Sequence, residues 1–386
     1  MIRRTWFAVA AAAAIAVSAC SPSESPAPSG SPGATAGPSA SPGASGEASG
    51  PPIDHVRLQL DGPVDAEFAG YIAAQALGYY DAEGVAVDLV PGGGSVDPVA
   101  AGSATSGPEF TIAWVPQVLA AREHSSDLVD IAQVFQRSGT ALVAWASSNL
   151  KTPCDLKGQA VGVWAAPADL EVTSMLTGCS LTAADYTAVP IDRDASQLLG
   201  KGVDAIQALT WDQEALVLEA TNPATGKQYT IDDITVFSAN ENRNATLQDA
   251  IFARAAWLKV AANRDIATRF VRAATRGWIY CREHQEDCVQ FVLKATTGLG
   301  TTHQRWMLNE VNSLIWPSAD GIGAIDPVLW QQTINLSMTA GLITKLPGID
   351  AYDDTIVSDV AASLADQDLT ATDYVKVPVG LAPGGK

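Results

Sequence analysis

The sequence predicts an α/β protein of two lobes, each a mostly parallel sheet flanked by helices. Three observations support this. Hydrophobic residues make up 47% of the 386 residues, which is enough for a large core. From residue 53 onward, strand-like segments alternate with helix-like segments. The alternation runs twice and then returns to helices, so we expect the chain to cross between lobes near Val143-Ala144 and near residues 238–240. A cleft between two such lobes is a common ligand site.

The first lobe is predicted from four strands and the helices between them. Val56 to Leu60 alternates apolar and polar residues, as a half-buried strand does. The helix that follows is stopped by Gly78, and Pro116 begins another, because proline suits the first helical turn. The predicted strands are 56–60, 86–90, 109–114 and 128–135.

The second lobe repeats this pattern, and the chain then becomes mostly helical. Thr152 and Pro153 are predicted to begin a short helix, as N-cap and first-turn residue. The predicted strands are 141–146, 159–164, 186–191, 204–209 and an extended segment at 230–237. The predicted late helices are 265–282, 286–295, 303–313 and 327–340. We therefore expect lobe 1 to comprise 53–143 plus 243–345, lobe 2 to comprise 144–242, and 346–386 to form a C-terminal tail without assigned structure.

The N-terminus predicts secretion and a lipid anchor. Arg3 and Arg4 precede a 14-residue apolar stretch at 6–19, too short to span a bilayer comfortably. Val17-Ser18-Ala19-Cys20 resembles a bacterial lipoprotein box, which implies cleavage after residue 19 and diacylglycerol on Cys20. The alternative is an ordinary signal peptide with Cys20 incidental. In 21–52, 29 of 32 residues are Ser, Pro, Gly or Ala, so residues 20–52 are expected to form a disordered linker.

Charge and cysteines exclude several classes of protein. With 42 acidic and 23 basic residues, the net charge of −19 argues against nucleic acid as a partner. The four histidines are isolated from one another, so we expect no metal site and no cofactor. Outside the cytosol, an even number of cysteines suggests disulfides, and the predicted pairs are Cys154–Cys179 and Cys281–Cys288. The second pair requires a helix break near residues 283–285, since seven residues of helix separate Cα atoms by about 10.5 Å.

Several segments, in order, resemble one family of periplasmic binding proteins, named after the yeast thiamine-pyrimidine synthase. They include Glu67-Phe68-Ala69-Gly70-Tyr71, Pro91-Gly92-Gly93 and Asn309-Glu310-Val311-Asn312 with Leu314-Ile315-Trp316-Pro317-Ser318. The segments 309–312 and 314–318 resemble the riboflavin-binding branch of this family. The resemblance implies a type II binding-protein fold, a small-molecule ligand, an ABC permease as partner, and a monomer. The sequence departs from the family at Leu60-Asp61, where a Trp is usual, and at Asp65 and Glu67, where Gln-x-Gln is usual.

Ligands of open α/β sheets bind at the carboxyl ends of strands, which nominates the ligand-binding residues. Trp114, Trp164 and Trp211 each end a strand or follow one, where a flat side chain can stack on a flat heterocycle. Ordinary packing is the alternative for each. The polar candidates and the glycines that permit close backbone approach are Asp65, Glu67, Gly92, Gly93 and Gln136. Asp65 also suits the start of a helix, where a carboxylate caps free N–H groups.

These features together predict a solute-binding lipoprotein of an ABC importer rather than an enzyme. No catalytic residues are nominated. A flavin such as riboflavin is the first choice of ligand, and a thiamine-precursor pyrimidine is the second. A sensor or partner-binding module of the same fold is one alternative, and a pyrimidine-synthesising enzyme is a weaker one, since the sequence has no dense cysteine cluster.

The lipoprotein hypothesis predicts that Cys20→Ala releases the protein from membranes or blocks its processing, because the acyl chains are attached through that thiol. Membrane fractionation and the mass of the mature N-terminus measure this. A Cys20→Ala protein that matures normally and still sediments with membranes would refute it.

Overall fold

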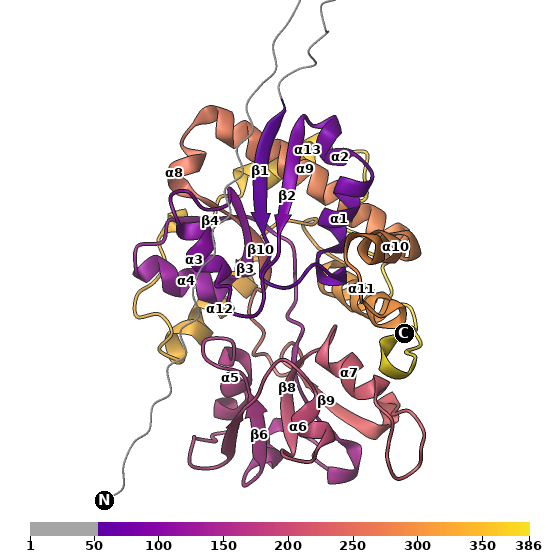
Figure 1. The fold of residues 1–386 in the computed structure, drawn as a ribbon. Helices are drawn as coiled ribbons and strands as arrows, with labels where there is room; N and C mark the ends of the chain where they lie inside the picture. The colour runs from indigo at the N-terminus through magenta and orange to yellow at the C-terminus, as the bar shows by residue number, and fades with distance from the viewer. Residues whose placement is uncertain (1–52) are drawn as a thin grey trace, which may run out of the picture. The chain divides into compact units, whose positions relative to one another are not determined.

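Two five-stranded sheets organise the residues that the structure describes, 53–386 of a computed structural model (Figure 1). The predicted signal peptide, Cys20 and the 20–52 linker lie outside the described residues. Both sheets belong to one compact unit of the chain. No helix among residues 53–386 is long and apolar enough to cross a membrane.

The first sheet has the strand order β2-β1-β3-β10-β4. Its strands are β1 (Asp54–Gln59), β2 (Val85–Val90), β3 (Phe110–Trp114), β4 (Leu128–Gln133) and β10 (Asp249–Arg254). β1 is parallel to β2 and β3, whereas β10 is antiparallel to both of its neighbours. Four strands therefore end at the same edge, and β10 begins there. The sequence did not indicate β10, whose six residues are all buried and show no alternation.

The second sheet has the order β7-β6-β8-β5-β9. Its strands are β5 (Thr140–Trp145), β6 (Ala160–Val163), β7 (Thr187–Pro190), β8 (Ala205–Leu209) and β9 (Ile234–Ser238). β5 is antiparallel to β8 and β9, and the other pairs are parallel. Each sheet is thus mixed: four of its five strands run in one direction, and the reversed strand makes two of its four pairs antiparallel. The predicted α/β class is confirmed.

The reversed strands mark where the chain crosses between the sheets. All of β5 belongs to the second sheet, since Ala141 pairs with Ala208 and Ser238. The first crossing therefore lies between β4 and β5, not at Val143-Ala144, and the predicted boundary at 143/144 wrongly divides one strand. The second crossing lies between β9 and β10, close to the predicted position at 238–240.

Helices cover both sheets, and those of the first sheet come from both ends of the chain (Figure 1). The helix α9 packs lengthwise on α1, and both lie beside α10. The predicted tail is not separate, because α13 packs on α9 and Tyr352 pairs with Asp130 at the edge of β4. The α-helices are α1 (Ala69–Ala76), α2 (Tyr79–Ala82), α3 (Pro98–Ser103), α4 (Val115–Glu123), α5 (Leu170–Gly178), α6 (Ser196–Leu199), α7 (Gln213–Glu219), α8 (Ala255–Leu258), α9 (Ala261–Glu283), α10 (Gln285–Ala295), α11 (Thr301–Ile315), α12 (Pro327–Thr339) and α13 (Thr355–Ser363).

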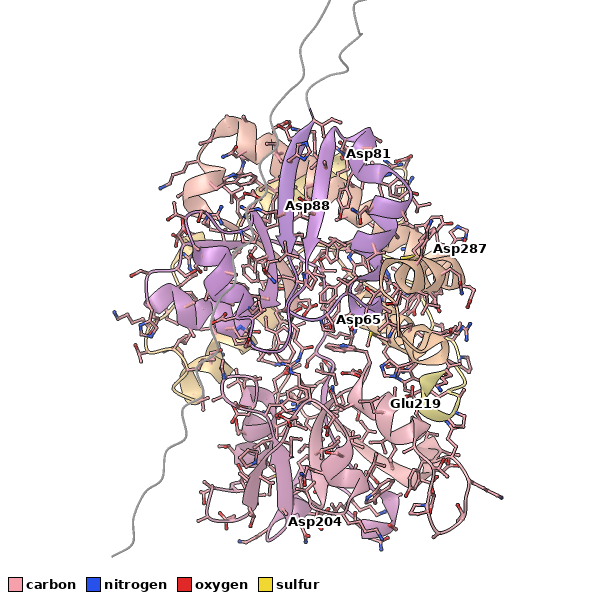
Figure 2. All side chains as sticks on the ribbon, in the orientation of Figure 1. Asp65, Asp81, Asp88, Asp204, Glu219 and Asp287 are labelled. Carbon is pink, nitrogen blue, oxygen red and sulfur yellow. A yellow bond between two sulfur atoms is a disulfide. The ribbon has the colours of Figure 1, made fainter. Side chains whose placement is uncertain are left out.

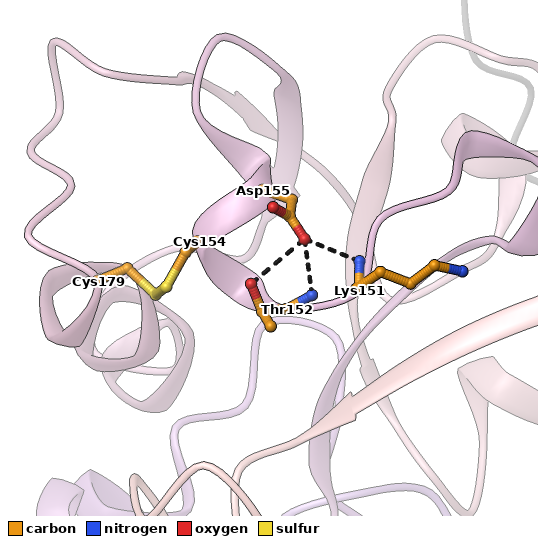
Figure 3. Close-up of a disulfide and its surroundings, with 5 residues drawn as sticks. All are labelled: Lys151, Thr152, Cys154, Asp155 and Cys179. Carbon is orange, nitrogen blue, oxygen red and sulfur yellow. Dashed lines mark hydrogen bonds between the residues drawn. A yellow bond between two sulfur atoms is a disulfide. The ribbon is translucent and has the colours of Figure 1, made fainter.

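Both predicted disulfides are confirmed. Cys281 and Cys288 have Cα atoms 5.5 Å apart, because α9 ends at Glu283 and α10 begins at Gln285, which is the predicted break. Cys154 and Cys179 have Cα atoms 5.1 Å apart and join the short helix η3 (Pro153–Leu156) to the end of α5. Figure 3 shows Asp155 accepting hydrogen bonds at the start of η3, where Thr152 is the predicted N-cap.

Glycines set the close approach of α1 and α9. A Cβ placed on Gly277 would lie 2.0 Å from the carbonyl oxygen of Gly70, and one on Gly70 would lie 2.1 Å from the Trp278 ring. No other residue allows this spacing. The two helices are therefore locked together by backbone contact and by the buried indole of Trp278.

We expect Gly277→Ala to lower the free energy of unfolding by about 2–3 kcal/mol, since the added methyl group must push α1 away. Chemical denaturation measures the loss. Gly178→Ala is the control, because nothing lies within 4 Å of that Cβ and alanine favours a helix by up to about 1 kcal/mol. Equal stability of the two variants would contradict this packing.

Candidate ligand-binding site

Three carboxylates converge where β1 and β3 end. Asp61 follows β1, Glu67 lies in the short helix η1 (Ala66–Phe68), and Asp249 begins β10. One oxygen from each lies within 4.8 Å of the others. Asp249 reaches this edge because it pairs directly with Trp114, the last residue of β3. We call Asp61, Glu67 and Asp249 the acidic cluster.

Burial makes the charged form of the acidic cluster costly. Asp249 is 2% exposed and Glu67 is 9% exposed. Burial, followed by the charge of Asp61, raises the pKa of both carboxyl groups well above the usual range. Burial also raises the pKa of Asp61 to about 6, although the charge of Arg193 opposes the shift. Groups that donate hydrogen bonds to these carboxylates, or bring positive charge, would favour their ionised form.

The second lobe contributes one cation and one aromatic wall. Trp164 follows β6, and Arg193 lies between β7 and α6. The Arg193 guanidinium carbon lies 4.5 Å from the Trp164 ring centre and 5.7 Å from that of Trp114. Within residues 53–386, Arg193 has no carboxylate within 4.0 Å, so stacking on indole rings holds it. When its carboxyl groups are ionised, the acidic cluster therefore has more negative charge than its one nearby cation balances.

Polar atoms in this region lack hydrogen-bond partners. Within the described chain, Oδ1 of Asp61 and of Asp249 accepts no hydrogen bond, and Nε1 of Trp114 and of Trp164 donates none. Both indoles are 5% exposed. A buried polar group without a partner costs roughly 1–3 kcal/mol. The acidic cluster therefore offers acceptors, and the two indoles offer N–H donors, to a polar molecule that enters between the lobes. The three carboxylates are also close enough to hold a cation.

Asp65 lies near this site and caps η1, as one of the two readings predicted. Its carboxylate accepts a hydrogen bond from the Glu67 amide at 3.0 Å. Burial raises the pKa of Asp65 to about 7. Figure 2 shows Asp65 between the two sheets and Glu219 on α7 of the second lobe.

His303 of α11 connects the two lobes beside Asp65. Its ring nitrogens lie 3.3 Å from Asp212 and 2.8 Å from Glu219, both of the second lobe. Burial alone would lower the pKa of His303, but hydrogen bonds to these two carboxylates raise it to about 9. The imidazolium therefore holds α7 against α11 at neutral pH.

The remaining predicted site residues lie around the acidic cluster rather than in it. Gly92 donates its N–H to the carbonyl of Gly62 at 2.8 Å, and a Cβ there would lie 2.1 Å from the Leu60 oxygen. Gly93 has a φ of +82° and faces Pro63. These two glycines therefore support the loop that carries Asp61, and a direct contact of either with a ligand stays a prediction.

Gln136 and Trp211 lie at the crossing between the lobes. The Gln136 amide donates to the carbonyls of Gln133 and Ala324, and the side chain lines a cavity of about 570 Å³. Trp211 is 1% exposed and packs edge-to-face on Phe135. Their roles in ligand binding stay predictions.

Sequence reasoning missed three residues of this site. Asp61 was noted as a departure from the family pattern, and its place directly after a strand could have nominated it. Asp249 begins β10, an antiparallel strand that the sequence did not predict. A search for residues at the carboxyl ends of strands therefore does not nominate it. Arg193 lies in a loop and is placed only by the contact between the lobes.

The fold is that of the type II periplasmic binding proteins. Sulfonate-binding protein SsuA from Methylobacillus flagellatus superposes with a TM-score of 0.62 at 17% identity, covering 85% of this chain and 99% of that one. The desulfurization enzyme DSZB superposes with a TM-score of 0.55 at 15% identity, covering 80% of this chain and 99% of that one. One fold therefore serves both binding proteins and an enzyme.

Residues 65–288 match the NMT1/THI5 like family, and the chain belongs to that family. Among curated proteins, it is similar to riboflavin-binding protein RibY from Chloroflexus aurantiacus. The two are 26% identical over 309 residues, which cover 76% of this chain and 83% of RibY. The family predicted from the sequence motifs is thus confirmed.

The acidic cluster predicts that stability falls as pH rises. The raised pKa values of Asp61, Glu67 and Asp249 mean that the folded state binds more protons than the unfolded state above about pH 4. The free energy of unfolding should therefore decrease from about pH 5 to about pH 7, through the pKa of about 6 of Asp61. Asp249→Asn should flatten this decrease, since the amide does not titrate.

Urea denaturation at several pH values measures this effect. Exposed Asp373 offers the control, because Asp373→Asn should keep the decrease of the original protein. If Asp249→Asn and the original protein show parallel curves, the acidic cluster does not carry the pH dependence.

Proposed function

We propose that this protein is the extracytoplasmic solute-binding component of an ABC importer, which captures a flat heterocycle between its lobes and delivers it to a membrane permease. One observation carries the proposal. Unpaired hydrogen-bonding atoms of Asp61, Asp249, Trp114 and Trp164 are buried together where the two lobes meet. A ligand that reaches them from between the lobes would pair them and hold the lobes closed.

A riboflavin-like flavin is the first candidate ligand. RibY, a relative at 26% identity, is named for riboflavin binding. The Trp114 and Trp164 rings are suited to stack on a tricyclic ring, at roughly 1 kcal/mol or more for each contact. The acidic cluster offers only acceptors when ionised, and the hydroxyl groups of a ribityl chain are donors that match it.

A thiamine-precursor pyrimidine is the second candidate, and the charge of the site supports it. An aminopyrimidine presents N–H donors at its ring edge, and its protonated form is a planar cation. Arg193, itself a planar cation, stacks on the same two indoles above the acidic cluster. A cationic ring that replaced this guanidinium would stack on the Trp114 and Trp164 rings and would lie near the three carboxylates of the acidic cluster.

The membrane anchor completes the proposed role. Lipid on Cys20 and the 20–52 linker would hold the binding domain near the permease, and the protein would act as a monomer. A sensor of the same fold would bind the same ligand without a permease. An enzymatic function is the weaker alternative. The similarity of the fold to DSZB supports it, but no catalytic residue is nominated in this chain.

We expect calorimetry with the purified soluble domain to show tight binding of riboflavin or of the aminopyrimidine. Trp164→Ala should weaken it at least tenfold, or about 1.4 kcal/mol, because one stacking wall is lost. Trp164→Phe should retain most of the affinity. Trp145→Ala is the matched control, since Trp145 lies at the opposite end of its sheet and contacts Tyr229.

Two outcomes would reject parts of this proposal. Tight binding of a non-aromatic solute or of a metal ion alone would reject the stacking model and leave the importer role in place. Unchanged affinity in both Trp114→Ala and Trp164→Ala would place the ligand elsewhere. Uptake of the ligand by cells that lack this protein, at the normal rate, would reject the importer role itself.

A further inference from the structure

A second cavity, of about 500 Å³, lies away from the acidic cluster. Four segments of the chain line it: α7 and the 228–231 segment of the second lobe, α11 of the first lobe, and the C-terminal segment 376–381. Hydrogen bonds hold the C-terminal segment in place. Asn309 donates to the Val377 carbonyl at 2.9 Å, and Gln228 donates to the Leu381 carbonyl at 3.0 Å. The cavity is therefore complete only where both lobes and this segment meet.

The walls of this cavity are apolar, and its charged groups do not balance. Leu218, Trp306, Pro378 and Leu381 supply apolar surface. Glu310, which is buried, is paired with Lys376 at 2.7 Å. Glu214 also lines the cavity and is 7% exposed. Its carboxylate has no hydrogen bond or ion pair with any residue of 53–386.

We propose that this cavity is a second ligand site, which binds a small organic amine with its ammonium group on Glu214 and its apolar part against Trp306 and Leu218. The volume is within the range for small-molecule pockets, which is about 300–1,000 Å³. A buried carboxylate without a partner is best stabilised by a cation that also donates hydrogen bonds. The apolar walls favour an amine that carries a hydrocarbon or aromatic body over a metal ion.

Because both lobes line the cavity, an amine bound there would stabilise the closed arrangement of the lobes. Trp306 already joins them, since its Nε1 donates to the Thr210 carbonyl at 2.9 Å. Occupation of the cavity should therefore raise the affinity of the cleft for its own ligand, and the cleft ligand should raise the affinity for the amine by the same factor.

The test uses 2-phenylethylamine as the probe and 2-phenylethanol as its uncharged analogue, with binding measured by calorimetry. The amine should bind and the alcohol should bind at least tenfold more weakly. Glu214→Gln should weaken the amine at least tenfold, which corresponds to about 1.4 kcal/mol, and should leave the alcohol unchanged. Exposed Glu241 provides the control, because Glu241→Gln should change neither.

The pH dependence gives a second readout that does not need a variant. Burial, and then the charge of Glu310, raises the pKa of Glu214 to about 8. The other titratable groups that face it are Glu310, Lys376 and Tyr229. Amine binding should therefore tighten as pH rises from about 6 to about 8, while binding of the alcohol should not.

Three results would overturn the proposal. The first is no binding of the amine at millimolar concentration. The second is equal affinity for amine and alcohol at every pH. The third is a loss of amine binding in Asp249→Asn, which would place the amine in the cleft. None of these bears on whether a heterocycle binds at Trp114 and Trp164.

Discussion

The described structure depends on one electrostatic imbalance: three carboxylates of the first lobe face a single guanidinium of the second. Asp61, Glu67 and Asp249 are held within 4.8 Å by the ends of β1 and β3 and the start of β10. Arg193 faces them from the second lobe, where its guanidinium stacks on the Trp164 ring. The cluster therefore favours closure of the lobes and, at the same time, favours any donor-rich molecule that can replace the guanidinium.

Close backbone packing and a disulfide hold the elements around this cluster. Gly70 and Gly277 bring α1 against α9 in backbone contact, and the Cys281–Cys288 bond fixes the turn into α10. Gly92 packs on the carbonyl of Leu60 and so fixes the loop of Asp61. The contact between the lobes is both polar and apolar: His303 pairs with Asp212 and Glu219, and Phe135 packs on Trp211. Opening of the lobes would break that contact without disturbing either sheet.

Sequence reasoning found the elements and the strand ends, because both depend on local patterns. The 283–285 break followed from helical rise alone, and Trp114 and Trp164 followed from their places after buried strands. It failed where distant parts of the chain meet. β10 is buried on both faces and carries no alternation, so Asp249 was missed. Arg193 lies in the loop between β7 and α6, and contacts between the two lobes set its position. The residues near it in the sequence therefore do not predict that position. Whether Gln136 and Trp211 contact a ligand depends on the same long-range contact.

The most direct test of this account is the proton balance of ligand binding, measured by calorimetry with riboflavin or the aminopyrimidine in two buffers of different ionisation enthalpy. Near pH 6, the pKa of Asp61 of about 6 and the raised pKa values of Glu67 and Asp249 leave the acidic cluster partly protonated. A ligand that donates hydrogen bonds to the cluster favours the ionised carboxylates, so binding should release protons to the buffer. Asp249→Asn should reduce the release. With riboflavin, whose ring does not titrate near pH 6, binding without proton exchange, or with net proton uptake, would contradict a site built on these carboxylates.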